Sequence, residues 1–299
     1  MSELRAWVNG RLVGATEPAL AVTDRGFQLG DGVFETLRVR RGVAIELDLH
    51  LRRLRDGLAV LQIPLLLDDT ALAAAISETV ESNAPDDAAV RVTVSRGAPL
   101  GRGLLPAGWH DLSPTVVVQA WPHHGAPPAL AAQGLRLVTS AARRDPSHPL
   151  ASVKTISRAD HVLAKLEAAQ AGADDTLVLN LDGNIAEATT ANIAALVAEP
   201  DGSPAILTPP IAAGILPGTT RDWLLSPAGA ADLGLPAREA LLTREALLAA
   251  SEVLLCSSVA GFVGVVAIDG VPIAGGRPGP WVARLRDARE AWIRRQAGG

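Results

Sequence analysis

Apolar and polar residues alternate in short stretches over the first 120 positions, and turn signals separate these stretches. Residues 7–13 contain an Asn-Gly pair between two such stretches, which is typical of a β-hairpin with a two-residue turn. A second hairpin is predicted over 34–47, with its turn at an Arg-Gly pair. Further strands are predicted over 89–95 and 115–121. The pattern therefore indicates an N-terminal sheet of short strands.

Between the second hairpin and the strand over 89–95, apolar residues recur at the spacing typical of helices. Over 48–61, Leu51, Leu54 and Leu58 recur at intervals of three and four residues, which places them on one side of a helix. A second helix is predicted over 70–83. The remaining predicted elements are strands over 135–140, 176–180, 205–207 and 252–256, and helices over 157–172, from Thr219 onward and over 281–296. Because helices and strands alternate in both halves, we predict an α/β or α+β fold in two lobes.

The segment that follows the strand over 115–121 is rich in proline and has no periodicity, which is typical of a linker. A length of 299 residues also favours two domains, at roughly 150 residues each. We therefore predict a small α/β domain over 1–121, a linker over 122–134 and a larger domain over 135–299.

Composition excludes several classes of function. The net charge is −5, with 27 Lys+Arg against 32 Asp+Glu, so the chain lacks the basic excess typical of proteins that bind nucleic acid. No apolar run approaches the roughly 18 residues of a membrane span, and the first residues lack the apolar core of a signal peptide. Cys256 is the only cysteine, which excludes a disulfide framework and a cysteine metal cage. We expect a protein of the cytoplasm, without metal, membrane or nucleic-acid partner.

Lysine occurs only at positions 154 and 165, and the other basic residues are arginine. Arginine stays protonated in proteins, so amine chemistry is confined to these two positions. Lys165 lies in a helical pattern beside polar residues and is expected to be a surface charge. Lys154 lies between a proline-rich loop and a helix, so it is either a surface charge or a reactive amine.

Three other features suit a phosphorylated ligand with a basic ring. Glu187 is the only acid in a small, apolar segment, so it needs a cation or hydrogen-bond donors, which neighbouring backbone or an arginine could also supply. Thr219 and Thr220 open a helix and either cap it or bind phosphate. Arg53 flanks an apolar helix side and is either solvated or paired with phosphate. Pyridoxal phosphate (PLP) needs an amine, an acid at its ring nitrogen and phosphate donors.

These segments together resemble the fold-type IV PLP enzymes, a family that includes branched-chain and D-amino acid aminotransferases and aminodeoxychorismate lyase. The resemblance runs from about Trp7 to Ala267 and depends on five segments in order: 24–36 (DRGFQLGDGVFET), 50–54, Lys154, 187–192 and 216–221. It implies PLP as cofactor, a small α/β lobe, a larger pseudo-barrel lobe and a homodimer.

The resemblance also implies a role for each matching residue. Lys154 would condense with the cofactor aldehyde and then move the substrate proton, and Glu187 would face the ring nitrogen. Leu216 would pack on the ring. The phosphate would be bound by Arg53, Thr219, Thr220 and Ser258, with Ser257 as the alternative hydroxyl.

Local patterns favour the lyase within this family. Residues 154–158 (KTISR) are similar to the lyase pattern Lys-x-Leu-Asn-Arg, and Arg102 in a Gly-Arg-Gly segment is expected to hold a carboxylate of an amine substrate. Ala159 stands where branched-chain aminotransferases typically have a tyrosine. We therefore predict aminodeoxychorismate lyase, which eliminates pyruvate from 4-amino-4-deoxychorismate and leaves 4-aminobenzoate for folate biosynthesis. The alternatives are a class IV aminotransferase for branched-chain or D-amino acids and, more distantly, a non-catalytic protein that binds a phosphorylated ligand.

Glu35 departs from the lyase pattern, in which some members have a threonine at this position. Glutamate is compatible with aminotransferases of the fold as well. Glu35 either contacts substrate and gives a proton to the leaving group, or is a polar residue at the mouth of the cleft.

Overall fold

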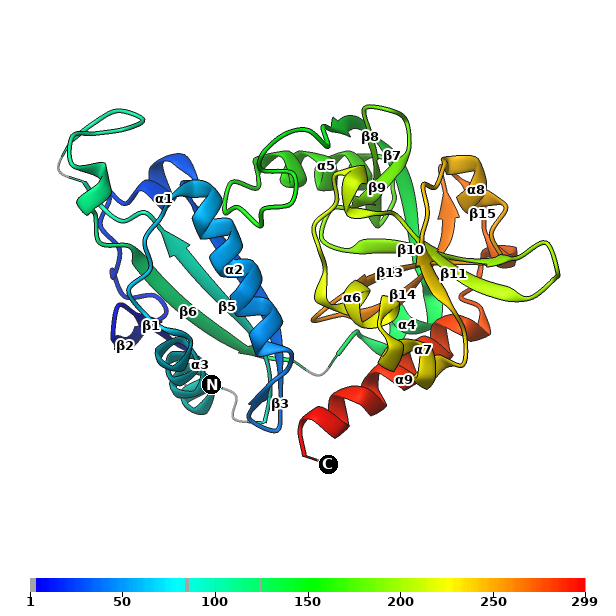
Figure 1. Ribbon diagram of the computed structural model, residues 1–299, viewed down its shortest axis with the longest axis horizontal. Coiled ribbons are helices and arrows are strands. Elements are labelled where there is room, and N and C mark those ends of the chain that lie inside the picture. The colour runs from blue at the N-terminus through cyan, green and yellow to red at the C-terminus, as the bar shows by residue number, and fades with distance from the viewer. Residues whose placement is uncertain (1–3, 84–85, 100, 124, 299) are drawn as a thin grey trace. The chain divides into compact units, whose positions relative to one another are not determined.

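The computed structural model describes residues 4–83, 86–99, 101–123 and 125–298, and the chain divides into two compact units (Figure 1). Unit 1 consists of Met1–His124, Val153–Arg158 and Gln296–Gly299, and unit 2 consists of Gly125–Ser152 and Ala159–Arg295. The first division lies inside the expected linker over 122–134, of which His124 is outside the described residues. The segment that carries Lys154 groups with unit 1, although we expected it in the larger domain.

Unit 1 is built on a six-stranded antiparallel sheet in the order β2-β1-β6-β5-β3-β4. Both predicted hairpins are confirmed, and Asn9, Gly10, Arg41 and Gly42 have the positive φ angles that such tight turns require. The strands are β1 (Arg5–Val8), β2 (Arg11–Gly14), β3 (Gly32–Arg40), β4 (Val43–Ala44), β5 (Asp87–Ser95) and β6 (Thr115–Pro122).

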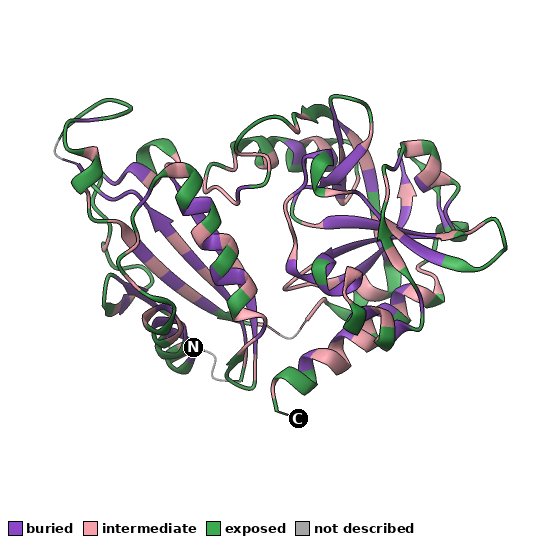
Figure 2. Ribbon diagram, viewed as in Figure 1, coloured by how far each residue is buried: buried purple, intermediate pink, exposed green. Residues whose placement is uncertain are grey.

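Three helices accompany this sheet: α1 (Arg25–Leu29), α2 (Leu47–Leu61) and α3 (Asp69–Asn83). The helix α2 packs on β3 through the buried leucines that the sequence pattern predicts, and α3 packs on β6 and β1. Buried and partly exposed residues alternate along β5, as Figure 2 shows. One face of the sheet is therefore buried, and a short 3-10 turn, η1 (Trp109–Asp111), lies in the β5–β6 connection.

Unit 2 contains a nine-stranded mixed sheet that curls on itself (Figure 1). The strand order is β12-β11-β10-β13-β14-β7-β8-β9, and β15 pairs with β14. The strands are β7 (Leu135–Arg144), β8 (Asp175–Asn180), β9 (Ile185–Ala188), β10 (Asn192–Ala198), β11 (Pro204–Thr208), β12 (Ala237–Glu239), β13 (Glu252–Ser257), β14 (Gly261–Ile268) and β15 (Val271–Pro272).

The two faces of this sheet have separate apolar cores. Val253 and Leu255 of β13 belong to one core, while Leu254 and Cys256 belong to the other, because successive side chains of a strand point to opposite faces. Burial raises the pKa of the Cys256 thiol to about 12, so this cysteine is a core residue and not a reactive one. The helices of the unit are α4 (Pro128–Gln133), α5 (Ala159–Gln170), α6 (Thr219–Leu225), α7 (Pro227–Leu233), α8 (Arg244–Leu248) and α9 (Pro280–Gln296), with 3-10 turns η2 (Ile211–Ala213) and η3 (Ala274–Gly276).

The predicted α/β class is confirmed, and the predicted elements are present with shifts of a few residues at their ends. The sequence pattern missed four short helices, α1, α4, α7 and α8, of which α4 occupies part of the expected linker, and the short strands β12 and β15. It also missed the strands β9, β10 and β14. These strands are buried on both faces, so they lack the alternation that marks a half-exposed strand. Among the described residues, no helix combines the length and the apolar character that crossing a membrane requires.

The start of α9 is held by a carboxylate from another element. Glu252 of β13 is buried, and its oxygens accept hydrogen bonds from the backbone N–H groups of Trp281 and Val282, each at 3.0 Å. These N–H groups lie in the first turn of α9, where no carbonyl of the helix can reach them. We expect Glu252→Gln to lower the free energy of unfolding by about 1–3 kcal/mol, as measured by urea denaturation. Glu81→Gln, at an exposed position of α3, is the control and should have little effect.

Candidate active site

Lys154 lies in a segment that runs beside β3 within unit 1. The backbone N–H of Phe34 donates to the carbonyl of Lys154 at 2.9 Å, and the N–H of Ile156 donates to the carbonyl of Gly32 at 3.1 Å. The amine nitrogen Nζ lies 4.6 Å from the centre of the Phe34 ring, within reach of a cation–π contact. Lys154 is therefore half-buried against an aromatic face and is not a solvated helix residue.

Glycines of the 24–36 motif make room for this segment. A Cβ atom on Gly26 would lie 3.0 Å from Ile156, and one on Gly30, whose φ is +66°, would lie 2.8 Å from the Cβ of Ser157. On Gly32 it would lie 2.3 Å from the carbonyl oxygen of Val94. A side chain on Gly30 would push the lysine segment away, whereas one on Gly32 would clash with the backbone of β5, so these glycines allow close approach of neighbouring segments.

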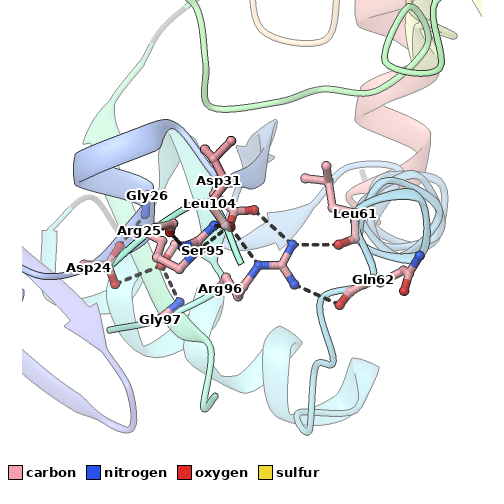
Figure 3. Close-up of polar contacts among 11 residues, drawn as sticks. Asp24, Arg25, Gly26, Asp31, Leu61, Gln62, Ser95, Arg96, Gly97 and Leu104 are labelled. Carbon is pink, nitrogen blue, oxygen red and sulfur yellow. Dashed lines mark hydrogen bonds and ion pairs between the residues drawn. The ribbon is translucent and has the colours of Figure 1, made fainter. Parts of the chain in front are cut away.

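A buried network of charges surrounds the start of this motif (Figure 3). Arg25 and Arg96 both donate to Asp31, with Nε to Oδ2 distances of 2.7 and 2.8 Å. Arg96 also donates to the carbonyls of Leu61 and Gln62 at the end of α2. Burial acts to raise the pKa of Asp31, but the two arginines outweigh it, and the net shift is downward. The Asp31 carboxylate, through Arg96, thus connects the 24–36 motif to the end of β5 and to the end of α2.

Arg102 lies on the long connection between β5 and β6, and its side chain is exposed. Arg25 holds this connection by donating to the carbonyls of Gly103 and Leu104, the first at 3.0 Å. The exposed position is compatible with a contact to a substrate carboxylate, and that role of Arg102 stays a prediction.

Glu35 and Arg53 are brought together, which the sequence did not indicate. Glu35 is 1% exposed and accepts from Arg53 through Nε and Nη2, both at 2.7 Å, and from Nδ1 of buried His50 at 2.8 Å. Neither part of the hypothesis for Glu35 fits this geometry: the carboxylate is not at a cleft mouth, and it is an acceptor for two neighbours. Arg53 itself is 11% exposed, so a small part of its side chain still reaches the surface of unit 1.

The buried charge of Glu35 is expected to make the free energy of unfolding depend on pH. Burial acts to raise the pKa of the Glu35 carboxyl, but hydrogen bonds from Arg53 and His50 outweigh it and lower the pKa to about 2, from 4.5. The ionised Glu35 carboxylate therefore stabilises the folded state fully above about pH 4.5, and this contribution is lost as the pH falls toward 2. We expect Glu35→Gln to lower the free energy of unfolding by about 3 kcal/mol at pH 7, with a smaller difference from the unmodified protein at pH 3, measured by urea denaturation. Glu78→Gln, on the exposed side of α3, should show neither effect, and an unchanged difference at pH 3 would contradict the assignment.

Glu187 lies on β9 in unit 2, where its side chain is buried and hydrogen bonded. Its Oε1 accepts from Nη2 of Arg144 at 2.8 Å. Its Oε2 accepts from the amide of Asn192 at 3.2 Å and from the backbone N–H of Leu216 at 3.1 Å. Such donors favour the ionised carboxylate and fix its direction.

The predicted phosphate residues of unit 2 lie on two turns, and hydrogen bonds connect the one before α6 to the Glu187 carboxylate. The Asn192 amide also donates to the carbonyl of Leu216, at 2.9 Å, and Gly218 caps α6 so close to Asn192 that a Cβ would lie 2.0 Å from its oxygen. Thr219 and Thr220 form the buried first turn of α6. The turn between β13 and β14 carries Ser258, whereas the alternative hydroxyl, of Ser257, accepts from the N–H of Ala260 within that turn.

The donor set of unit 2 fits PLP. The hydroxyl of Thr220 is 1% exposed and has no hydrogen-bond partner among the described residues, which suits contact with a phosphate oxygen. Glu187 is a buried and oriented carboxylate of the kind that a protonated ring nitrogen needs. Arg144 was not among the predicted site residues, because nothing in the sequence pattern distinguishes it from the many other arginines.

Comparisons with known proteins agree with this interpretation. The family described as amino-transferase class IV matches residues 32–268. A putative branched-chain-amino-acid aminotransferase of Methanocaldococcus jannaschii is 32% identical over 97% of this chain and 98% of its own length. A D-alanine aminotransferase of Bacillus licheniformis is 30% identical over 95% of each chain. A branched-chain amino acid aminotransferase of T.th., solved with N-(5'-phosphopyridoxyl)-L-glutamate, superimposes with a TM-score of 0.85 at 29% identity, covering 100% of this chain and 95% of the other.

The lyase is less well supported than we predicted. An aminodeoxychorismate lyase of Vibrio harveyi is 31% identical, but over only 62% of this chain and 65% of its own length. The lyase prediction depended on a short pattern around Lys154, whereas the aminotransferases are similar to this chain over nearly its whole length. The fold-type IV architecture and PLP as cofactor are confirmed by the family and the solved structures. This chain belongs to the class IV aminotransferase family, whose members are PLP-dependent enzymes.

Proposed function

We propose that this enzyme transfers the amino group of an aliphatic amino acid to a 2-oxo acid, with L-branched-chain amino acids as its substrates. The observation that carries this proposal is Glu187, a buried carboxylate oriented by Arg144, Asn192 and the backbone of Leu216. When bound, PLP withdraws electron density from the substrate carbon that carries the amine, and a charged partner at the ring nitrogen supports this withdrawal.

The proposal assigns a role to the predicted residues other than Glu35. Lys154 binds the cofactor aldehyde through Nζ and moves the proton of the substrate carbon. Glu187 keeps the ring nitrogen protonated, and Leu216 packs on the ring. The phosphate is bound by Arg53, Thr219, Thr220 and Ser258, and Arg102 binds the substrate carboxylate.

The substrate class follows from the relatives that span nearly the whole chain. Branched-chain aminotransferases are found among both the sequence relatives and the solved structures, which favours branched-chain substrates. The D-alanine aminotransferase of similar identity makes D-amino acids the second candidate. Ala159, where branched-chain aminotransferases typically have a tyrosine, also favours testing this second candidate.

A substrate panel separates these candidates. The PLP-loaded protein is incubated with 2-oxoglutarate and, separately, with L-valine, L-leucine and D-alanine, and the 2-oxo acid and the configuration of the glutamate formed are measured by chiral chromatography. We expect L-glutamate and the branched 2-oxo acid. D-Glutamate with D-alanine alone would establish the second candidate. Formation of 4-aminobenzoate from 4-amino-4-deoxychorismate, without amino transfer, would overturn the proposal in favour of the lyase.

The resemblance also leads us to propose a homodimer that works in the cytoplasm. The single cysteine means that no disulfide forms within the chain, in keeping with a reducing compartment. Light scattering coupled to size-exclusion chromatography would show twice the mass of one chain.

A further inference from the structure

One guanidinium in unit 2 joins three segments of the chain. Arg144, the last residue of β7, donates from Nη2 to Oε1 of Glu187 at 2.8 Å and to the carbonyl of Ala151 at 3.1 Å. Its Nε donates to the carbonyl of Gly214 at 2.9 Å. The side chain is 19% exposed, so these contacts are shielded from most of the solvent. Arg144 thus fixes β9, the loop after β7 and the turn before α6 to one another.

The segments that Arg144 holds are those next to the proposed cofactor residues. Ala151 precedes Lys154 by three positions, and Gly214 precedes Leu216 by two. Gly214 has a φ of +87°, and a Cβ there would lie 3.2 Å from Cγ of Arg144, so a glycine allows this approach. A rotation of Arg144 would disturb the Leu216 turn and the Glu187 carboxylate together.

Arg144 also places a positive charge next to Glu187. Of the three donors described above for this carboxylate, the Asn192 amide and the Leu216 N–H are neutral, and Arg144 is the charged one. An arginine does not give up its proton in proteins, so it favours the ionised carboxylate over the whole working pH range. Its planar fork also restricts the direction of the carboxylate more than a lysine would.

We propose that Arg144 is a positioning residue for the cofactor: it holds Glu187 charged and oriented toward the ring nitrogen and fixes the turn that carries Leu216. The proposal rests on the proposed function, in which Glu187 faces that nitrogen. Arg144 itself is not proposed to touch the cofactor or the substrate.

Two variants separate the charge of Arg144 from its geometry. Arg144→Gln removes the charge and keeps an amide donor, whereas Arg144→Lys keeps the charge but cannot reach the three acceptors from one nitrogen. The apoprotein of each is titrated with PLP, and the dissociation constant is measured by tryptophan fluorescence. The pH midpoint of the visible absorption of the bound cofactor is measured separately. Arg136→Met is the matched control, because Arg136 lies on the same strand and pairs with Asp174 at an exposed position.

We expect Arg144→Gln to weaken PLP binding about tenfold and to raise the absorption midpoint by about one pH unit, because a neighbouring positive charge is lost. Arg144→Lys should weaken binding severalfold and leave the midpoint in place. A wild-type dissociation constant in Arg144→Gln would overturn the proposal. So would weaker binding with an unshifted midpoint, because it would leave Arg144 a structural role alone. Glu187→Gln tests the underlying function separately: wild-type binding and midpoint in that variant would reject Glu187 as the ring partner, whatever Arg144→Gln shows.

Discussion

Lys154→Ala is expected to reduce amino transfer by a factor on the order of 10⁴ and to abolish covalent attachment of the cofactor. Lys154 packs against Phe34, whereas the only other lysine of the sequence, Lys165, is mostly exposed, and the arginines near Lys154 in sequence cannot replace it. Arginine cannot form the same bond with an aldehyde or accept the substrate proton. Turnover is measured with the substrate panel, and attachment is measured by mass spectrometry after borohydride reduction.

The second lysine of the chain is the natural control. Lys165 is 55% exposed on α5, where Nζ donates to the carbonyl of Asp174 at 2.6 Å and pairs with Asp175 at 3.2 Å. Lys165→Ala should retain nearly full activity and the mass of one bound cofactor. Normal turnover by Lys154→Ala, or a cofactor label on Lys165, would remove the basis of the proposed function.

Glu187→Gln is expected to lower kcat by a factor on the order of 10² while keeping the fold. Glutamine has nearly the same shape but no charge, so the proton on the cofactor ring loses its counter-charge. The substitution also leaves the partly buried Arg144 with a neutral amide in place of its anionic partner, which weakens the contact. We therefore expect a lower melting temperature in addition to the slower reaction, and both are measured on the same preparation.

The matched control for this variant is another glutamate that pairs with an arginine in unit 2. Glu199 accepts from Nη2 of Arg238 at 2.8 Å, the same distance as in the Arg144–Glu187 pair, but on the surface. Glu199→Gln should leave kcat unchanged and alter stability by less than about 1 kcal/mol. An equal loss of activity in both variants would mean that Glu187 acts through stability alone.

Local patterns predicted the elements that depend on a few neighbouring residues. The Asn9-Gly10 turn, the leucine spacing of α2 and the alternation of β5 are visible within short windows of the sequence, and the structure contains all three. The doubly buried strands β9 and β14 could not be recognised in this way, because a buried strand and a buried helix both appear as apolar runs.

The sequence by itself determined which residues can carry the chemistry: one lysine outside a helix face, one acid in an apolar segment and the ordered motifs around them. Only the tertiary structure decided their partners. Arg53 meets Glu35, 18 positions away, and Arg144 meets Glu187, 43 positions away. The physical reason is that a charged side chain is stabilised by whatever the fold places within about 3 Å of it, and the strand order of a sheet, not proximity along the chain, sets those neighbours.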